Sequence, residues 1–286
     1  MADQPMLEIR NLRVRFETPQ GPMYAVDGVS FSLGREKLGI VGESGSGKSM
    51  SGRAILKLTP PQATVTADRL RFEEVDLLKA TERQMLDIRG SRIGMILQDP
   101  KYSLNPVVRV GEQIAEAYRL HRKAGKAEAR SRALAMLEAV QIRDPARVFD
   151  LYPHEVSGGM GQRIMIAMML VAEPSLLIAD EPTSALDVTV RMEVLNLLDE
   201  LIRSRGLGLI FVSHDLNLVR KFCDRVIIMY AGRIVEALKA SELEHAQHPY
   251  TRGLLASLPR IHSPRPRLPV LKREPGWRTS PSVSAA

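Results

Sequence analysis

The sequence predicts an α/β fold built on a mostly parallel sheet, and three observations carry this prediction. Short apolar runs typical of buried strands alternate with segments of helical periodicity along most of the chain. Glycine-rich junctions separate several of these segments, as they do where a strand passes into a helix. A central stretch, residues 99–172, departs from the alternation, and we interpret it as a helical insertion.

The first half of the chain contains strands that build the N-terminal part of the predicted core. Residues 7–16 alternate apolar and polar side chains, which indicates an edge-type strand with one slip in register. A second strand is expected at 29–33, after a loop rich in proline and glycine. The apolar run 38–41 precedes a helix that begins at Lys48, and residues 93–97 form another short buried strand.

The second half contains the insertion and then a return to alternating elements. Helical periodicity marks residues 110–121 and 127–140, and a methionine-rich helix begins at Gln162. Two further apolar runs, joined at Ala231-Gly232, are typical of a closing β-hairpin. The remaining expected elements are strands at 176–179 and 207–212, helices at 190–204 and 216–222, and hairpin strands at 226–230 and 233–237.

These changes of pattern predict four parts. Residues 1–98 and 173–237 form a discontinuous core, residues 99–172 the helical subdomain, and residues 238–259 a C-terminal segment. Residues 260–286 are a basic, proline-rich tail, which we interpret as solvated, with contact to anionic lipid or a partner as the alternative.

Composition excludes several classes of protein. The chain has 286 residues and a net charge of +7, but the tail holds most of that excess. Residues 1–259 carry only +2, which weakens the case for nucleic-acid binding. A single cysteine, Cys223, excludes a disulfide framework and a cysteine-only iron–sulfur site within the chain. No apolar run reaches the ~20 residues that span a bilayer, so we expect a soluble protein whose membrane role comes through partners.

A phosphate-binding loop is the most specific motif. The segment Gly42-Glu43-Ser44-Gly45-Ser46-Gly47-Lys48-Ser49 fits the pattern GxxxxGK[ST] between a predicted strand and a predicted helix. Glycines allow a tight turn, so that successive N–H groups converge on a phosphate at a helix N-terminus. Lys48 can reach the β and γ oxygens of a nucleotide, and the Ser49 hydroxyl can ligate Mg²⁺.

Two adjacent acids follow the predicted strand 176–179. Asp180 at the carboxyl end of the strand is suited to the Mg²⁺ shell. Glu181 then points the other way across the pleat, where its carboxylate could polarise an attacking water. An exposed acidic turn is the plain alternative, and the residues that follow argue against it.

Further motifs resemble those of the ABC-type ATPases. Val156-Ser157-Gly158-Gly159-Met160 resembles the family's signature sequence, with Met160 in place of the commoner glutamine. Ser184-Ala185-Leu186-Asp187 looks like the D-loop, Gln98 like the Q-loop glutamine and His214 like the switch histidine. The order and spacing agree over roughly residues 7–258. An isolated Ser157 would otherwise be an ordinary helix N-cap.

The resemblance implies a RecA-like P-loop ABC ATPase core with a mixed sheet, an inserted helical subdomain and a short C-terminal extension. It implies ATP and Mg²⁺ as ligands, with ATP sandwiched between one chain's phosphate loop and a second chain's signature. Ser157, Gly158, Gly159, Met160 and Asp187 would meet the partner's nucleotide. Glu181, His214 and Gln98 would serve catalysis, and Ser49, Gln98 and Asp180 would hold the metal.

An aromatic side chain near the end of the first strand stacks on adenine in this family. Phe16 is our preferred candidate, and Tyr24 is the rival because the intervening loop leaves the register open. Either side chain could instead serve packing alone.

Residues 248–257 (HPYTRGLLAS) resemble the C-terminal segment of ATPases from bacterial oligopeptide, dipeptide and nickel importers. Such a subunit pairs with a second, related ATPase, most often as a heterodimer, beneath two transmembrane permeases fed by an extracytoplasmic solute-binding protein. The resemblance places the chain peripherally on the cytoplasmic face of the bacterial inner membrane. Many long members bind an iron–sulfur cluster after this segment, and with no cysteine beyond Cys223 we expect none here.

Two alternatives stay open at this stage. One is a soluble ABC ATPase that acts on nucleic acid or ribosomes, although no sustained heptad run or second cassette is present. The other is a nucleotide-binding subunit with little hydrolysis of its own, against which Glu181 and His214 both argue. We expect no nucleic-acid partner.

Overall fold

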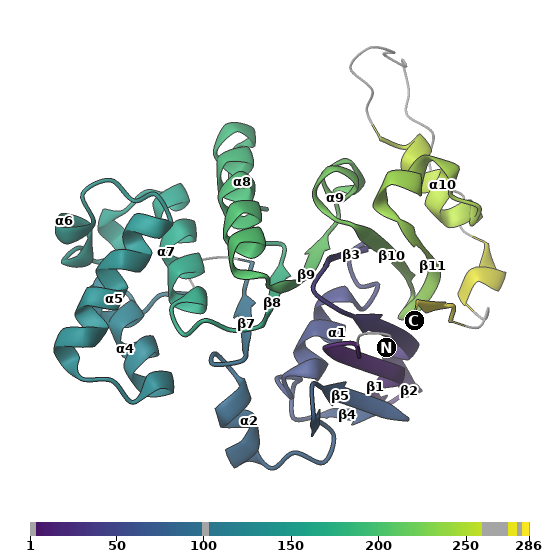
Figure 1. The fold of residues 1–286 in the computed structure, drawn as a ribbon. Helices are drawn as coiled ribbons and strands as arrows, with labels where there is room; N and C mark the ends of the chain where they lie inside the picture. The colour runs from purple at the N-terminus through teal and green to yellow at the C-terminus, as the bar shows by residue number, and fades with distance from the viewer. Residues whose placement is uncertain (1–3, 99–102, 259–273, 279–281, 286) are drawn as a thin grey trace. The chain divides into compact units, whose positions relative to one another are not determined.

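The computed structural model describes residues 4–98, 103–258, 274–278 and 282–285 (Figure 1). The chain divides into two compact units: unit 1 comprises residues 1–80 and 210–286, and unit 2 comprises residues 81–209. The helical segment predicted at 99–172 lies within unit 2, which also holds elements on either side of it.

Unit 1 contains a largely antiparallel sheet near the N-terminus. Its long strands β1 (Leu7–Thr18) and β2 (Gly21–Leu33) form a hairpin with register shifts between Ile9 and Arg13 and again after Val14. The sheet runs in the order β12-β2-β1-β5-β6, with β4 also paired to β1. The shorter strands are β4 (Ala63–Thr66), β5 (Arg69–Phe72), β6 (Val75–Asp76) and β12 (Ser284–Ala285).

The same unit contains parallel strands that carry the phosphate loop. β3 (Lys37–Val41) pairs in parallel with β10 (Arg225–Tyr230), which forms an antiparallel hairpin with β11 (Arg233–Lys239). On its other side β3 lies beside β9 (Gly208–Ser213), which belongs to unit 1 from residue 210 onward. The helical elements are α1 (Lys48–Ile55), α9 (Leu216–Phe222), α10 (Pro249–Ala256), and the 3₁₀ turns Ala240–His245 and Pro275–Arg278.

Unit 2 is mainly helical around one parallel strand pair. β7 (Ile93–Ile96) and β8 (Leu176–Asp180) pair in parallel, and every residue of both strands is buried. Packing among the helices is close, because a Cβ at Gly111 would lie 2.1 Å from the ring of Phe149. The helices are α2 (Glu82–Ile88), α4 (Val110–Arg122), α5 (Lys126–Ala139), α6 (Pro145–Phe149), α7 (Gly158–Leu170) and α8 (Val188–Arg205), with a 3₁₀ turn at Pro153–Glu155.

Mixed sheets covered by helices confirm the predicted α/β class, while three predictions about single elements are wrong. The second strand begins at Gly21 and not at residue 29, so most of the expected proline- and glycine-rich loop lies within β2. β1 is not an edge strand, since β2 lies on one side and β4 and β5 on the other. The methionine-rich helix begins at Gly158, four residues before the predicted start at Gln162, because Ser157 caps it there.

The interpretation of the tail as solvated is wrong for Trp277 and Ala285, which are buried, while several other described tail residues are exposed. Ala285 pairs with Phe31 of β2, and its carbonyl accepts a hydrogen bond from Arg225 Nη1 at 2.6 Å. Trp277 is only 6% exposed and packs against aromatic side chains of unit 1. These residues therefore belong to the folded body of unit 1.

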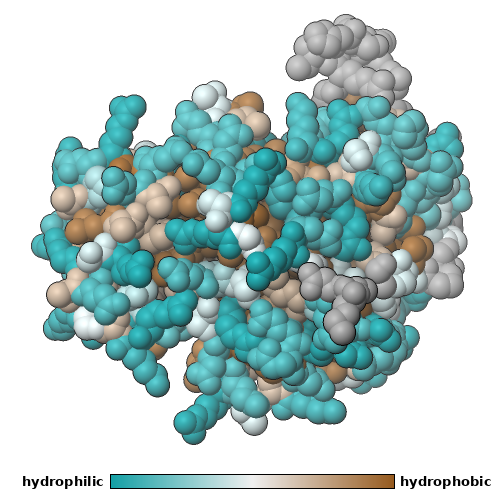
Figure 2. Space-filling view, viewed as in Figure 1, coloured by the Kyte–Doolittle hydropathy of each residue, from teal (hydrophilic) through white to brown (hydrophobic). Residues whose placement is uncertain are grey.

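The face of the molecule in Figure 2 is mainly hydrophilic, with small apolar areas between the polar side chains. Among the described helices, none combines the length and the apolar character that crossing a bilayer requires.

Candidate functional site

The phosphate loop, residues 42–49, joins β3 to α1 and depends on its glycines. Gly45 and Gly47 adopt φ values of +78° and +99°, in the left-handed region that side chains disfavour. Space is also limiting: a Cβ at Gly42 would lie 2.2 Å from the Met229 carbonyl oxygen, and one at Gly47 would lie 2.4 Å from that of Ala25. Both backbone conformation and close packing therefore require glycine here.

Hydrogen bonds give this loop a compact shape. The Ser46 N–H donates to the Glu43 carbonyl at 3.2 Å, and the Ser46 carbonyl accepts from the Gly232 N–H at 3.0 Å. Lys48 Nζ donates to the carbonyls of Gly42 and Glu43 at 2.8 and 2.9 Å, and the side chain is 5% exposed. The loop thus folds around its lysine.

The loop's own chemistry fits a phosphate ligand. The Ser46 hydroxyl is buried without a hydrogen-bond partner among the described residues, so a polar atom there is available to a ligand. The lysine charge and the N-terminus of α1 both favour an anion at this position. Ser49, half-buried in the first turn of α1, supplies a hydroxyl oxygen of the kind Mg²⁺ accepts.

The two adjacent acids lie in unit 2, at the end of β8. Asp180 is the last residue of the strand and is 5% exposed. Glu181 lies beyond it in a turn with φ of +48°, and its carbonyl accepts hydrogen bonds from the N–H and hydroxyl of Ser184. The prediction that the pleat directs Glu181 is therefore wrong, because this turn sets its direction. Its left-handed backbone is a strained conformation of the kind that clusters at functional sites.

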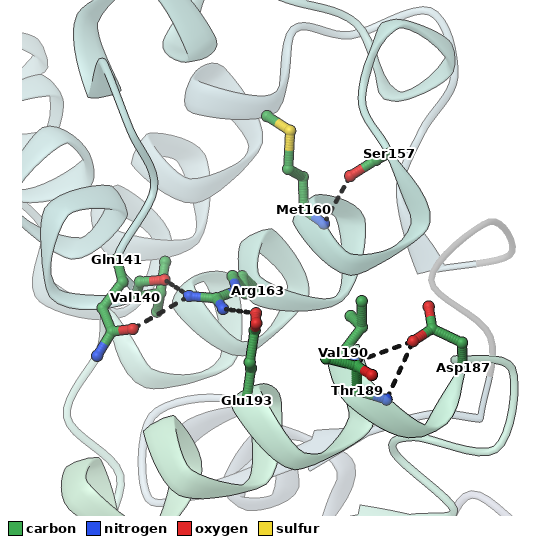
Figure 3. A network of polar contacts seen from close by, with 9 residues as sticks. All are labelled: Val140, Gln141, Ser157, Met160, Arg163, Asp187, Thr189, Val190 and Glu193. Atoms are coloured by element: carbon green, nitrogen blue, oxygen red, sulfur yellow. Dashed lines mark hydrogen bonds and ion pairs between the residues drawn. The ribbon is translucent and has the colours of Figure 1, made fainter.

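The signature segment, residues 157–160, opens helix α7. Ser157 is the N-cap, and its hydroxyl accepts a hydrogen bond from the Met160 N–H at 3.3 Å (Figure 3). A Cβ at Gly159 would lie 2.7 Å from Val190 of α8, so the glycine permits close approach of the two helices. Within the described part of the chain, the N–H groups of Gly158 and Gly159 at this helix start have no hydrogen-bond partner, and an anion site without lysine uses such groups.

Asp187 caps the neighbouring helix α8. Its Oδ1 accepts from the N–H groups of Thr189 and Val190, each at 3.1 Å (Figure 3). Arg163 of α7 ties the two helices together through Glu193 Oε2 at 3.1 Å and also reaches the Val140 carbonyl. Residues 157–160 and Asp187 thus line one groove of about 1300 Å³ within unit 2.

Gln98 and His214 each follow the end of a strand. Gln98 is exposed two residues after β7 ends, and part of the loop after it, residues 99–102, lies outside the described residues. His214 is exposed immediately after β9, and its neighbour Asp215 caps α9 by accepting from the Leu218 N–H at 3.1 Å. Both side chains are accessible to a ligand.

The two candidates for adenine stacking lie in the β1–β2 hairpin. Phe16 pairs with Met23 and is half-buried, whereas Tyr24 pairs with Arg15 and is 39% exposed. Residues adjacent in register along a strand face opposite sides of a sheet, so the two rings lie on opposite faces of this hairpin. Only one of them can therefore stack on a nucleotide.

The predicted residues are shared between the two units. Unit 1 holds Phe16, the phosphate loop and His214, and unit 2 holds Gln98, Asp180, Glu181, residues 157–160 and Asp187. Sequence reasoning missed one direct neighbour of the phosphate loop, Tyr250, whose hydroxyl accepts the Glu43 N–H at 3.2 Å. The two residues are 207 positions apart, and no local pattern links them.

Comparison with known proteins gives consistent matches. The family model described as ABC transporter matches residues 26–184. The probable peptide ABC transporter ATP-binding protein y4tR of Sinorhizobium fredii is 48% identical, over 92% of this chain and 80% of that protein. The oligopeptide transport ATP-binding protein OppD of Bacillus subtilis is 47% identical, over 90% of this chain and 73% of that protein.

Solved structures agree with the sequence matches. An ATP-binding cassette in a dimeric post-hydrolysis state with ADP and Pi has a TM-score of 0.71 and 27% identity, covering 82% of this chain and 99% of that one. The cbiO1 protein from Clostridium perfringens, part of the cbiONQ complex, has a TM-score of 0.73 and 26% identity, covering 85% and 92%.

Proposed function

We propose that this chain, which belongs to the ABC transporter family, is the ATP-hydrolysing subunit of a bacterial importer for peptides or a related small solute. The observation that carries the proposal is the phosphate loop, with its two left-handed glycines and its buried Lys48. The chain that contains this loop is 46–48% identical to named peptide, oligopeptide and dipeptide transport ATP-binding proteins. Dipeptides, oligopeptides and nickel are the solute classes that we consider.

Each candidate site residue has a role in this proposal. The N–H groups and Lys48 of the phosphate loop bind the nucleotide phosphates, and one of Phe16 and Tyr24 stacks on adenine. Ser49, Asp180 and Gln98 would hold Mg²⁺, which when bound neutralises phosphate charge. Glu181 accepts a proton from the attacking water, and His214 orients that water.

The groove of residues 157–160 and Asp187 receives the nucleotide of a second ATPase subunit, a related chain in a heterodimer. That the solved cassette described above is dimeric supports this arrangement. The pair would lie peripherally at the cytoplasmic face of the inner membrane, beneath two permease subunits supplied by an extracytoplasmic solute-binding protein. Hydrolysis would then be coupled to solute passage through the permeases.

A matched pair of lysine variants tests nucleotide binding. Lys48→Ala removes the loop charge, whereas Lys57→Ala removes a lysine that likewise donates to two backbone carbonyls, those of Leu78 and Ala80, outside the loop. We expect Lys48→Ala to lose tight ATP binding and ATPase activity while Lys57→Ala retains both. Equal ATP affinity in the two variants would refute the assignment of the phosphate loop.

Transport is tested in cells that lack the gene. We expect uptake of one solute class to stop, to return with the wild-type gene, and to stay absent with the Glu181→Gln gene. Intact uptake of peptides, nickel and metallophores alike would refute the importer assignment. Neighbouring genes for two permeases, a binding protein and a second ATPase would support it independently.

A further inference from the structure

We propose that Tyr250 of helix α10 is a positioning residue for the phosphate loop, and that its hydroxyl sets the affinity of the loop for ATP. This inference rests on the proposed function and adds a residue to it. The Glu43 N–H donates to Tyr250 Oη at 3.2 Å. The carbonyl of the same peptide unit, that of Gly42, accepts from Lys48 Nζ at 2.8 Å. One peptide group is thus bonded on one side by the phosphate-binding lysine and on the other by Tyr250.

Packing holds the Tyr250 side chain in this position. It is completely buried, and its ring centroid lies 4.6 Å from that of Tyr230 and 5.9 Å from that of Trp277. Trp277 also contacts the ring of His248 at 5.8 Å. Packing within the aromatic cluster that these four residues form therefore favours the orientation in which the Tyr250 hydroxyl meets the loop.

The helix that carries Tyr250 is itself fixed to the sheet. Glu236 of β11 accepts hydrogen bonds from the N–H groups of Gln247 and His248 at 2.6 and 3.2 Å. His248 caps the helix, with its Nδ1 accepting from the Tyr250 N–H at 3.2 Å. The hydroxyl is thus presented by a rigid support, and its contact is built into the fold of unit 1.

The same part of the chain supports the loop at a second point. The turn from Glu43 to Ser46 is closed by the Ser46 N–H, and the Ser46 carbonyl accepts from Gly232 at the tip of the β10–β11 hairpin. Tyr230, in the aromatic cluster, immediately precedes that tip. The turn is therefore held at one end by the hairpin and at the other by Tyr250.

This arrangement determines how much ordering ATP binding requires. A phosphate is bound by successive N–H groups only if the loop holds them at fixed positions. A loop that is already held loses less conformational freedom on binding than a loop that must be ordered by its ligand, so its affinity is higher. Removing the Tyr250 hydroxyl would take away the contact between the Glu43 N–H and helix α10 and so reduce this preorganisation.

Two tyrosine variants isolate the hydroxyl from the packing. Tyr250→Phe removes the oxygen that accepts the Glu43 N–H and keeps the ring in the cluster. Tyr230→Phe removes a hydroxyl of the same cluster that has no hydrogen-bond partner among the described residues, and it serves as the matched control. Both variants are compared with the wild-type full chain for binding of radiolabelled ATP in EDTA, by equilibrium dialysis, and for melting temperature.

We expect Tyr250→Phe to raise the Kd for ATP about 3- to 10-fold, the effect of one lost hydrogen bond of ordinary strength. Tyr230→Phe should stay within about 2-fold of wild type, because it leaves the loop contact intact. In steady-state assays KM for ATP should rise with Tyr250→Phe while kcat changes little, since no reacting group is altered.

Three results would overturn the inference. The first is a Kd for ATP of Tyr250→Phe within about 2-fold of wild type. The second is an equal rise of the Kd for ATP in Tyr250→Phe and Tyr230→Phe. The third is a fall in the kcat of Tyr250→Phe with its KM for ATP unchanged. The second result would assign the effect to packing of the cluster. Wild-type protein that binds no ATP would refute the proposed function together with this inference, whereas ATP-binding wild type with an unaffected Tyr250→Phe refutes the inference alone.

Discussion

Replacing Gly47 by alanine should destabilise the phosphate loop through both its backbone conformation and its packing. The residue has φ of +99°, and a Cβ there would lie 2.4 Å from the Ala25 carbonyl oxygen and 3.3 Å from Met229 Cε. A left-handed backbone costs a residue with a Cβ about 1–2 kcal/mol, and overpacking against a backbone atom adds about 1–3 kcal/mol. We therefore expect Gly47→Ala to lower the free energy of unfolding by about 2–5 kcal/mol and to weaken ATP binding.

Gly45→Ala is the matched control in the same loop. Gly45 has φ of +78°, but a Cβ there meets nothing within 4 Å. Only the backbone cost of about 1–2 kcal/mol then applies, so urea unfolding should separate the two variants by about 1–3 kcal/mol. If Gly47→Ala were as stable as Gly45→Ala, the reasoning from the Ala25 contact would be refuted.

The remaining predictions concern Glu181, the ring that stacks on adenine, and Cys223. Glu181→Gln should bind ATP normally and release phosphate at least about 100-fold more slowly, because it lacks the general base. Near-normal ATP turnover in this variant would rule out Glu181 as the general base. Phe16→Ala should raise the Kd for ATP about 5- to 150-fold, which corresponds to about 1–3 kcal/mol of lost stacking. Tyr24→Ala should leave the Kd for ATP unchanged. The reverse result would show that adenine stacks on Tyr24 and not on Phe16. Burial raises the pKa of the Cys223 thiol, so its maleimide labelling at pH 8 should be far slower in the native chain than in urea. Because the unfolded thiol ionises near pH 9.0 and the folded thiol only well above it, the free energy of unfolding should fall as pH rises past 9.0; fast native labelling would contradict this burial.

Sequence patterns predicted the elements whose signals are local. The phosphate loop between β3 and α1 followed from glycine spacing, and helix α9 has the predicted bounds because Asp215 caps a short apolar repeat. The prediction that β1 is an edge strand is wrong, since its partners β4 and β5 are short and partly polar and give little periodic signal.

Tertiary contacts account for what the sequence did not predict. Trp277 lies in a basic, proline-rich stretch of the kind that is usually solvated, yet the ring packs on Tyr230 and Tyr250. The direction of Glu181 depends on a turn with positive φ that nothing in its own residue type requires. The Trp277 contacts join segments that are distant in sequence, whereas the Glu181 turn is a local conformation that its residue type does not specify. Patterns of neighbouring residues therefore predict neither feature.

The hydrogen bond between the Ser46 carbonyl and Gly232 has a consequence for biosynthesis. The phosphate loop emerges early from the ribosome, but this hairpin support is made about 190 residues later. At ~5–20 residues per second, that delay is roughly 10–40 s. During this interval the nascent loop lacks its contact with the hairpin, so we expect cellular ATP to stabilise the chain more strongly once the hairpin has been translated.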